Sequence, residues 1–256
     1  MLAPKRISNT IAFFLLAVMF ILMFFSSLNE SAIMDELAHI PAGYSYLTQK
    51  DYRFNPEHPP LAKDLAALPL LFLNLNFPTE VKAWTEDING QWAMGRIFLY
   101  ESGNDPDQIL FWSRLPFMLL AIFFGWLIFS WSRRLYGERV GLMTLSFFTF
   151  SPTFIAHSRY VTTDLAAALG FFIGIITFVR YIELPSIKRL FITGLALGIA
   201  LLLKFSLALL IPVFLLIILC WGFLSQLDEL RELGNNSSRI KKVLATWAKL
   251  FLRLLA

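Results

Sequence analysis

Long apolar runs recur along this chain, and they limit the folds that it can adopt. The first run covers residues 11–28, which is the length that a bilayer-spanning helix needs. Later runs cover residues 115–131, 140–156, 165–181, 190–203 and 205–224. The last two predict separate helices, because about 35 apolar residues exceed a single crossing and Lys204 divides them. We therefore expect an all-α, polytopic transmembrane helical bundle with six spans.

Composition supports the membrane class. Hydrophobic residues make up 57% of the chain and charged residues only 16%, outside the usage of soluble globular domains. The net charge of +4 does not indicate nucleic-acid binding, because the basic residues lie in short clusters between apolar runs. The lone Cys220 allows no disulfide within the chain. The first run could also be read as a signal peptide, but it is longer than a usual signal h-region, so we expect it to remain as an anchor.

The basic clusters predict the orientation. Lys or Arg residues precede the first span and follow the second, fourth and sixth, which places these segments in the cytoplasm. Residues 1–28 then form the cytoplasmic N-terminus and first span, 29–112 an outer loop, and 113–224 five further spans. Residues 225–256 form a cytoplasmic loop and the start of another helix, so we expect the chain to end within a larger protein's helical domain. The expected location is the plasma (inner) membrane, with multiple spans and an outward active face.

A polar segment, residues 30–63, follows the first span directly. It holds the titratable residues Asp35, Glu36, His39, Asp51, Arg53, Glu57, His58 and Lys63. Ionisable groups beside a membrane cost insertion free energy, so their density indicates function. The Leu-rich stretch after it, residues 60–78, is bounded by prolines and too irregular to span. It predicts one or two helices lying in the membrane interface.

Asp35 and Glu36 open this segment. A partly desolvated carboxylate there could act as a base for an alcohol, while the alternative is an acidic pair that favours a helix N-terminus. Asp35 and His39 stand four residues apart and share a helical face. The D-E-x-x-H string lacks the first histidine of zinc proteases, so a protease is not predicted. A divalent metal held by some of Asp35, His39, His58 and Asp164 is a further possibility, because carboxylates and imidazoles suit several metals.

Two other polar strings add candidates. Prolines at 56, 59 and 60 stiffen the backbone around Glu57 and His58, although the same string could be a turn that starts a helix. Residues 158–164 predict a turn with a cation and a carboxylate, or a helix start with Thr162 or Thr163 as its cap and Asp164 in its first turn. Lys204 could snorkel to the interface or meet a phosphate.

These strings resemble a known family. D-E at 35–36, D-Y-R-F-N-P-E-H-P-P-L-A-K at 51–63, R-Y-V-T-T-D at 159–164 and L-L-L-K-F-S at 201–206 are similar to those of phospholipid-carrier-dependent glycosyltransferases. This group comprises the protein O-mannosyltransferase and aminoarabinose-transferase relatives with the GT-C architecture. The resemblance implies a long first outer loop with interfacial helices, and it covers the N-terminal part of a typical member.

The resemblance also implies roles for particular residues. Asp35 would be the base, with Glu36 as its neighbour, and Asp164 would match a second acidic motif. Glu57 and His58 would correspond to a pair linked to the carrier phosphate or to a metal. His58 stands where the aminoarabinose branch has lysine, which leaves open whether a cation or a ligand is needed there.

The implied reaction moves a sugar from a polyprenyl-phosphate donor to an acceptor hydroxyl, with inversion at the anomeric carbon. It needs a base for the acceptor and positive charge near the departing phosphate. By charge and side, Arg159, His58, Lys63 and Lys204 are candidates to bind that phosphate. The acceptor could be a protein, lipid or glycan, and membrane lipid is the expected surround. The alternatives are a transporter or lipid flippase without transferase chemistry, and a non-catalytic membrane anchor.

Overall fold

The computed structural model describes the backbone of residues 5–232 and the side chains of residues 5–222. Within that part of the chain it contains helices and no strand, which confirms the prediction of an all-α polytopic fold. Four helical stretches are long and apolar enough to cross a membrane: Lys5–Ser27, Pro106–Tyr136, Thr163–Glu183 and Phe205–Gly222. The bent pair Glu138–Thr149 and Pro152–Ser158 makes a fifth if it counts as one span. Helix α10 (Ile187–Leu203), the remaining predicted span, has 17 residues, close to the lower limit of about 17 for a crossing.

The chain forms two compact units. The first comprises the residues up to Gly170 together with Gly198–Phe205, and it contains every candidate site residue. The second comprises Phe171–Leu197 and the residues from Ser206 onward. Within the second unit, the rings of Phe178 and Phe214 stack with centroids 3.9 Å apart, which joins helix α9 (Thr163–Glu183) to helix α11 (Leu210–Glu232).

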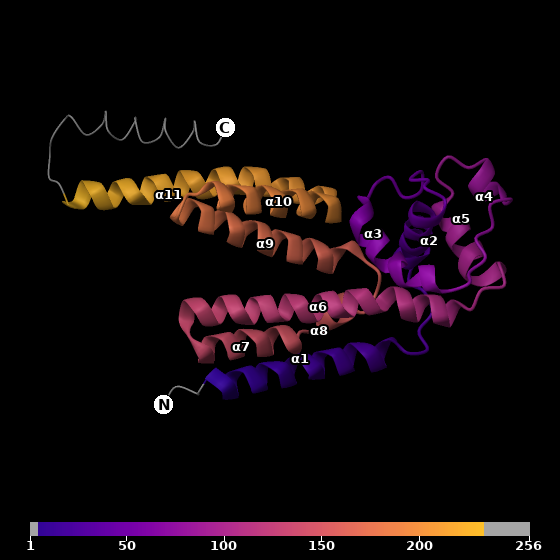
Figure 1. Ribbon diagram of the computed structural model, residues 1–256, viewed down its shortest axis with the longest axis horizontal. Coiled ribbons are helices and arrows are strands. Elements are labelled where there is room, and N and C mark those ends of the chain that lie inside the picture. Colours follow the sequence, from indigo (N-terminus) through magenta and orange to yellow (C-terminus); the bar gives the residue numbers. More distant parts are fainter. Residues whose placement is uncertain (1–4, 233–256) are drawn as a thin grey trace. The chain divides into compact units, whose positions relative to one another are not determined.

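Three long helices organise the first unit. Helices α1 (Lys5–Ser27), α6 (Pro106–Tyr136) and α7 (Glu138–Thr149) run side by side, and α6 is antiparallel to both (Figure 1). Asp105 caps α6 by accepting from the backbone N–H groups of Asp107 and Gln108, with Pro106 at the first helical position. Gly137 separates α6 from α7 with φ +89°, a backbone conformation that favours glycine.

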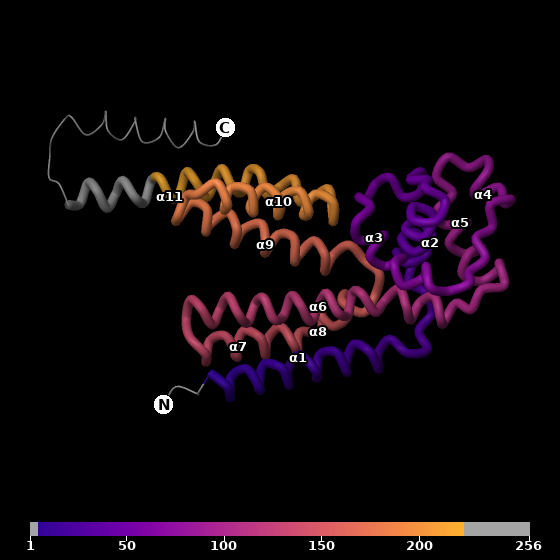
Figure 2. The backbone as a smooth tube through the Cα atoms, in the orientation of Figure 1, coloured from indigo at the N-terminus to yellow at the C-terminus, as the bar shows by residue number. Residues whose placement is uncertain are grey.

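The segment predicted to form the outer loop folds into short helices that pack near the N-terminal end of α6 (Figure 2). They are α2 (Met34–Thr48), α3 (Pro60–Ala67), η1 (Leu68–Phe72), α4 (Lys82–Thr85), α5 (Gln91–Arg96) and η2 (Ile97–Glu101). A Cβ atom on Gly43 would lie 2.1 Å from the Lys63 carbonyl oxygen, and one on Gly95 would lie 1.9 Å from that of Leu37. These glycines therefore allow α3 and α5 to pack directly on α2. Helices α3 and η1 occupy most of the stretch where interfacial helices are predicted.

Two breaks shape the later helices. The predicted span over 140–156 is bent by 61° between α7 and α8 (Pro152–Ser158), because Pro152 disfavours helical backbone at Ser151. Helix α10 ends at Leu203, and Lys204 separates it from η3 (Phe205–Leu209), as the sequence predicts. Helix α11 continues to Glu232, beyond the predicted limit of 224, since residues 225–232 contain no Gly or Pro to end it. The remainder of the predicted cytoplasmic segment, residues 233–256, lies outside the described residues.

Candidate functional site

Asp35 lies in the first turn of α2 with an exposed side chain. Its carboxylate forms no ion pair or hydrogen bond with the residues that the structure describes. It lies near His58, because its charge acts to raise the pKa of that imidazole. Among the acidic candidates Asp35, Glu36, Glu57 and Asp164, Asp35 is thus the one whose carboxylate has no partner among the described residues.

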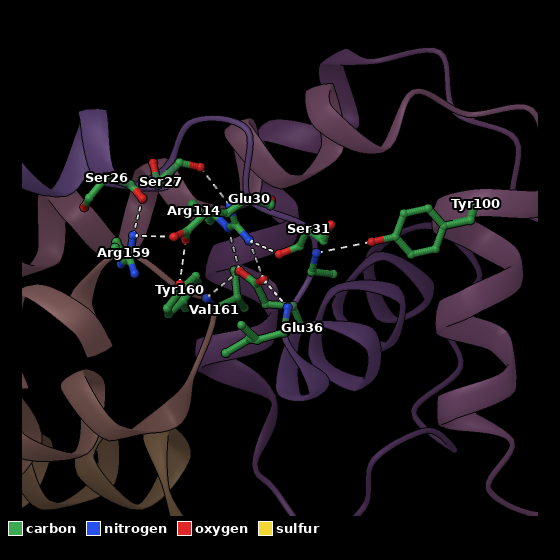
Figure 3. A network of polar contacts seen from close by, with 12 residues as sticks. Ser26, Ser27, Glu30, Ser31, Glu36, Tyr100, Arg114, Arg159, Tyr160 and Val161 are labelled. Atoms are coloured by element: carbon green, nitrogen blue, oxygen red, sulfur yellow. Dashed lines mark hydrogen bonds and ion pairs between the residues drawn. The ribbon is translucent and has the colours of Figure 1, made fainter.

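The neighbouring Glu36 is fully buried in an ion pair with Arg114 of α6 (Figure 3). Arg114 donates from Nε and Nη2 to the two carboxylate oxygens, both at 2.8 Å. Its remaining donors bind the backbone carbonyls of Ser27, Glu30 and Ser31 at 3.1–3.2 Å. All five N–H groups of the guanidinium are therefore satisfied, as burial requires.

Glu36 accepts two further hydrogen bonds, from the backbone N–H of Ile33 at 3.0 Å and of Val161 at 3.1 Å. The first is the reciprocal bond that fixes the start of α2. The second ties α2 to the turn that precedes Asp164. With four donors on two oxygens and no exposed surface, Glu36 is placed as an anchor, whereas the sequence names it with Asp35 as a catalytic candidate.

Arg159 is engaged within the same region (Figure 3). Its guanidinium donates to the carbonyl of Ser26 and to Glu30 Oε1 at 2.9 Å, and it lies over the ring of Tyr160. Tyr160 donates to the other Glu30 oxygen at 2.6 Å. Arg159 therefore fastens the residue 159–161 turn to the end of α1. This arrangement weakens its candidacy as a phosphate ligand.

Asp164 and Lys204 form an ion pair in the first unit. Asp164 lies in the first turn of α9, and its Oδ1 accepts from Lys204 Nζ at 2.7 Å. His157 Nδ1 lies 3.5 Å from the other oxygen. A quarter of the Lys204 side chain is exposed, so the ammonium keeps donors for a further partner. Electrostatic interactions link His58 to both Lys204 and Asp164, which places the two polar motifs beside one another.

His58 is half-buried, and Glu57 beside it is exposed. Burial lowers the pKa of His58, and the charges of Lys204 and Lys63 lower it further. The carboxylates of Glu57 and Asp35 act in the opposite direction and raise this pKa only in part. Burial acts to raise the pKa of Glu57, but the hydrogen bond from Gln91 Nε2 at 2.6 Å and the nearby cations lower it on balance. Glu57 is thus a stable carboxylate at neutral pH, and His58 is mostly neutral unless an anion approaches.

His39 packs under His58, with ring centroids 5.2 Å apart and the planes at 76°. Only 4% of it is exposed, and burial, with the charges of His58 and Lys63, lowers its pKa to about 4. Among the described residues, no group of three or more His, Cys, Asp or Glu side chains could hold a metal ion. The described structure thus does not gather Asp35, His39, His58 and Asp164 into such a group: His39 lies edge-on to His58, and Asp164 pairs with Lys204.

Lys63 is buried and does not face the solvent. Its ammonium donates to the hydroxyl of Tyr46, to the side chain and carbonyl of Asn55, and to the carbonyl of His58. With only 1% of the residue exposed, it is inaccessible to a phosphate. Of the four cations named from the sequence, His58 lies near Asp35 and interacts with Lys204, and both of these side chains are partly exposed.

Residues 107–227 match the family model for dolichyl-phosphate-mannose-protein mannosyltransferases. This match confirms the resemblance to the GT-C glycosyltransferases. The matched GT-C segment contains Arg114, Asp164 and Lys204, while Asp35 and His58 precede it. No curated protein and no solved structure matches the chain. Together with its apolar helices, the match supports an integral, multi-pass membrane glycosyltransferase.

Three residues that contact these candidate residues were not named as candidates from the sequence: Arg114, His157 and Gln91. Arg114 is a lone cation in a long apolar run, and such a charge indicates a buried partner or a site. His157 precedes the R-Y-V-T-T-D string, and its distance from Asp164 in sequence gives no sign that they meet. Gln91 lies outside every recognised string, so only the tertiary structure brings it to Glu57.

Proposed function

We propose that the chain transfers a sugar from a polyprenyl-phosphate donor to an acceptor hydroxyl at the outer face of the membrane. The observation that carries this proposal is the unpaired carboxylate of Asp35 near the half-buried His58, which interacts in turn with Lys204 and Asp164. A free base next to available positive charge is what glycosyl transfer from a phosphate requires. The family match supports the same class of reaction.

Asp35 accepts the proton of the acceptor hydroxyl as its oxygen attacks the anomeric carbon of the sugar. The bond from that carbon to the phosphate oxygen breaks, and polyprenyl phosphate leaves with the bonding electron pair. Attack from the face opposite the phosphate inverts the anomeric configuration, as the family resemblance implies. The phosphate leaves as a stable anion, so the reaction needs no strong general acid.

Lys204 and His58 bind the departing phosphate in this proposal. Lys204 is oriented by Asp164 and retains free donors on its ammonium. His58 gains a proton more readily when a phosphate approaches, because an anion raises the pKa of an imidazole. Glu57 holds the loop through Gln91, and Asp164 keeps Lys204 turned toward the site. Arg159 and Lys63 do not bind the phosphate in this proposal, because their donors are engaged by other groups of the protein.

The test is sugar transfer by the full chain in proteoliposomes, with polyprenyl-phosphate mannose as donor and serine- or threonine-containing peptide, lipid and glycan acceptors compared. Asp35→Asn removes the base with little change in size and should lower the turnover number by more than about 100-fold, the usual scale for losing a general base. Asp87→Asn, at an exposed position, is the matched control and should retain wild-type transfer.

Full transfer by Asp35→Asn, with normal insertion into the bilayer, would remove Asp35 from its role as base. A wild-type chain that carries the donor across the bilayer without cleaving it would favour the flippase alternative. A parallel assay with a chelator would reveal whether Glu57 and His58 work through a bound metal.

A further inference from the structure

The ammonium of Lys63 is enclosed by oxygen atoms of the protein itself. Its Nζ lies 2.7 Å from the Tyr46 hydroxyl, 2.8 Å from the carbonyls of Asn55 and His58, and 3.2 Å from Asn55 Oδ1. Within the described residues no carboxylate lies within ion-pair distance of Nζ. The four oxygens in direct contact with the ammonium are therefore all neutral, while the charges of Glu57 and Asp64 act on it from beyond ion-pair distance. We call these four oxygens the Lys63 cage.

The cage is built largely from the loop that presents Glu57 and His58. Two of its oxygens are backbone carbonyls of that loop, and Asn55 adopts φ +50°, which is unusual for a residue other than glycine. Carbonyl oxygens that converge on one point repel each other unless a cation lies between them. The ammonium of Lys63 thus stabilises a loop conformation in which these carbonyl oxygens would otherwise repel each other.

The cage continues to the Glu57 carboxylate through side chains. Asn55 Nδ2 donates to Gln91 Oε1 at 2.6 Å, and Gln91 Nε2 donates to Glu57 Oε1 at 2.6 Å. Only 4% of Gln91 and 2% of Asn55 are exposed, so water offers little competition for these bonds. On the other side, Tyr46 donates to the carbonyl of Phe54, which fixes the start of the loop.

We propose that Lys63 is a positioning residue whose buried ammonium, held by the oxygens of Tyr46, Asn55 and His58, sets the loop that carries Glu57 and His58. It acts through the loop and does not contact the donor phosphate. The effect on sugar transfer rests on the proposed function, whereas the effect on loop geometry does not. A buried lysine without a carboxylate partner costs folding free energy, which an apolar residue of similar length would avoid. Its presence is explained by the loop that it organises.

Lys63→Ala empties the cage and leaves its oxygens in place, so an added amine can replace the missing atoms. Propylammonium corresponds to the three methylenes and the ammonium removed, whereas tetramethylammonium has the charge but no N–H donor. Loop geometry is followed by the rate at which a cysteine at position 58 reacts with a water-soluble maleimide, in a Cys220→Ala background. Lys63→Met is a second variant of similar volume, and Lys82→Ala, at an exposed lysine, is the control.

We expect the labelling rate at position 58 to change several-fold in Lys63→Ala and Lys63→Met and to stay the same in Lys82→Ala. Propylammonium should restore the rate in Lys63→Ala, and tetramethylammonium should not. Lys63→Ala in a chain that retains His58 should lose sugar transfer, and propylammonium should restore it. Both the loss and the recovery should be mainly in the turnover number.

A labelling rate that Lys63→Ala and Lys63→Met leave unchanged would overturn the proposal. Loss of folded protein in both variants would also overturn it, by making Lys63 a requirement of the whole fold. If labelling and its rescue behave as expected while the wild-type chain transfers no sugar, the cage stands and the proposed function fails.

Discussion

Burial separates residues that look equivalent in the sequence. Asp35 and Glu36 are adjacent carboxylates, yet the first is exposed and the second is enclosed by four hydrogen-bond donors. Lys63 and Lys204 are both lysines near polar motifs, yet only Lys204 reaches the surface. The role of each group follows from which donors and acceptors surround it, and these partners come from distant parts of the chain.

The buried charge of Lys63 predicts a pH dependence of stability. Burial lowers its pKa from 10.5 to about 8, and Glu57 and Asp64 oppose this only in part. Between pH 8 and 10.5 the unfolded chain keeps a proton that the folded chain has released, so the unfolding free energy rises with pH. The full difference is about 3 kcal/mol, at about 1.4 kcal/mol per pKa unit.

Thermal unfolding in detergent at pH 7.5 and pH 10 measures this effect. The melting temperature of the wild type should rise between these pH values relative to that of Lys63→Met, which has no group to titrate there. If the melting temperatures of the two proteins changed by the same amount between pH 7.5 and pH 10, the pKa of Lys63 would be ordinary in the folded chain.

Local patterns predict some of these residue roles and not others. The position of Asp35 at a helix start and the break at Lys204 follow from nearby sequence alone. The sequence predicts a partly desolvated Asp35 carboxylate, whereas the structure leaves it exposed. The burial of Glu36 depends on Arg114, which is 78 residues away. Such a pairing has no signature in periodicity or spacing, so the sequence alone did not distinguish the catalytic candidate from its structural neighbour.

At the scale of elements, one ion pair joins four segments. Arg114 of α6 binds the carbonyls at the end of α1 and in the α1–α2 connection, and Glu36 of α2 binds the backbone at Val161 (Figure 3). Asp35 directly precedes Glu36 in the sequence, and Asp164 follows Val161 closely. The ion pair therefore holds the two acidic motifs at a fixed separation.

A double-mutant cycle tests this junction. Glu36→Gln and Arg114→Gln should each lower the unfolding free energy by about 3 kcal/mol or more, because each leaves a buried charge without its partner. The double variant should lose clearly less than the sum, with a coupling of about 1–3 kcal/mol. Additive losses, measured by thermal unfolding, would mean that the two side chains do not depend on each other.

At the scale of the whole chain, apolar length predicts most helices well, because a bilayer span is a local property of about 20 residues. The bend before Pro152 and the continuation of α11 to Glu232 depend on local backbone preferences that hydropathy does not describe. The packing of α2–α5 is harder to predict, since it depends on glycines at which the backbones nearly touch.

The predicted orientation places His58 and Asp164 outside and the Lys188–Arg189 cluster in the cytoplasm. Single cysteines at positions 58, 164 and 188, in the Cys220→Ala background, test this in intact cells. We expect a membrane-impermeant maleimide to label positions 58 and 164 from outside and position 188 only after the membrane is permeabilised. Labelling of 58 and 188 from the same side would reject the six-span arrangement.

We propose that this membrane protein cleaves a polyprenyl-phosphate sugar and does not merely move it across the bilayer. The most direct measurement follows both products in proteoliposomes that contain the wild-type chain, labelled donor and acceptor. We expect equal amounts of free polyprenyl phosphate and glycosylated acceptor, with the anomeric configuration inverted. Intact donor recovered on the opposite leaflet, with no polyprenyl phosphate released, would contradict it.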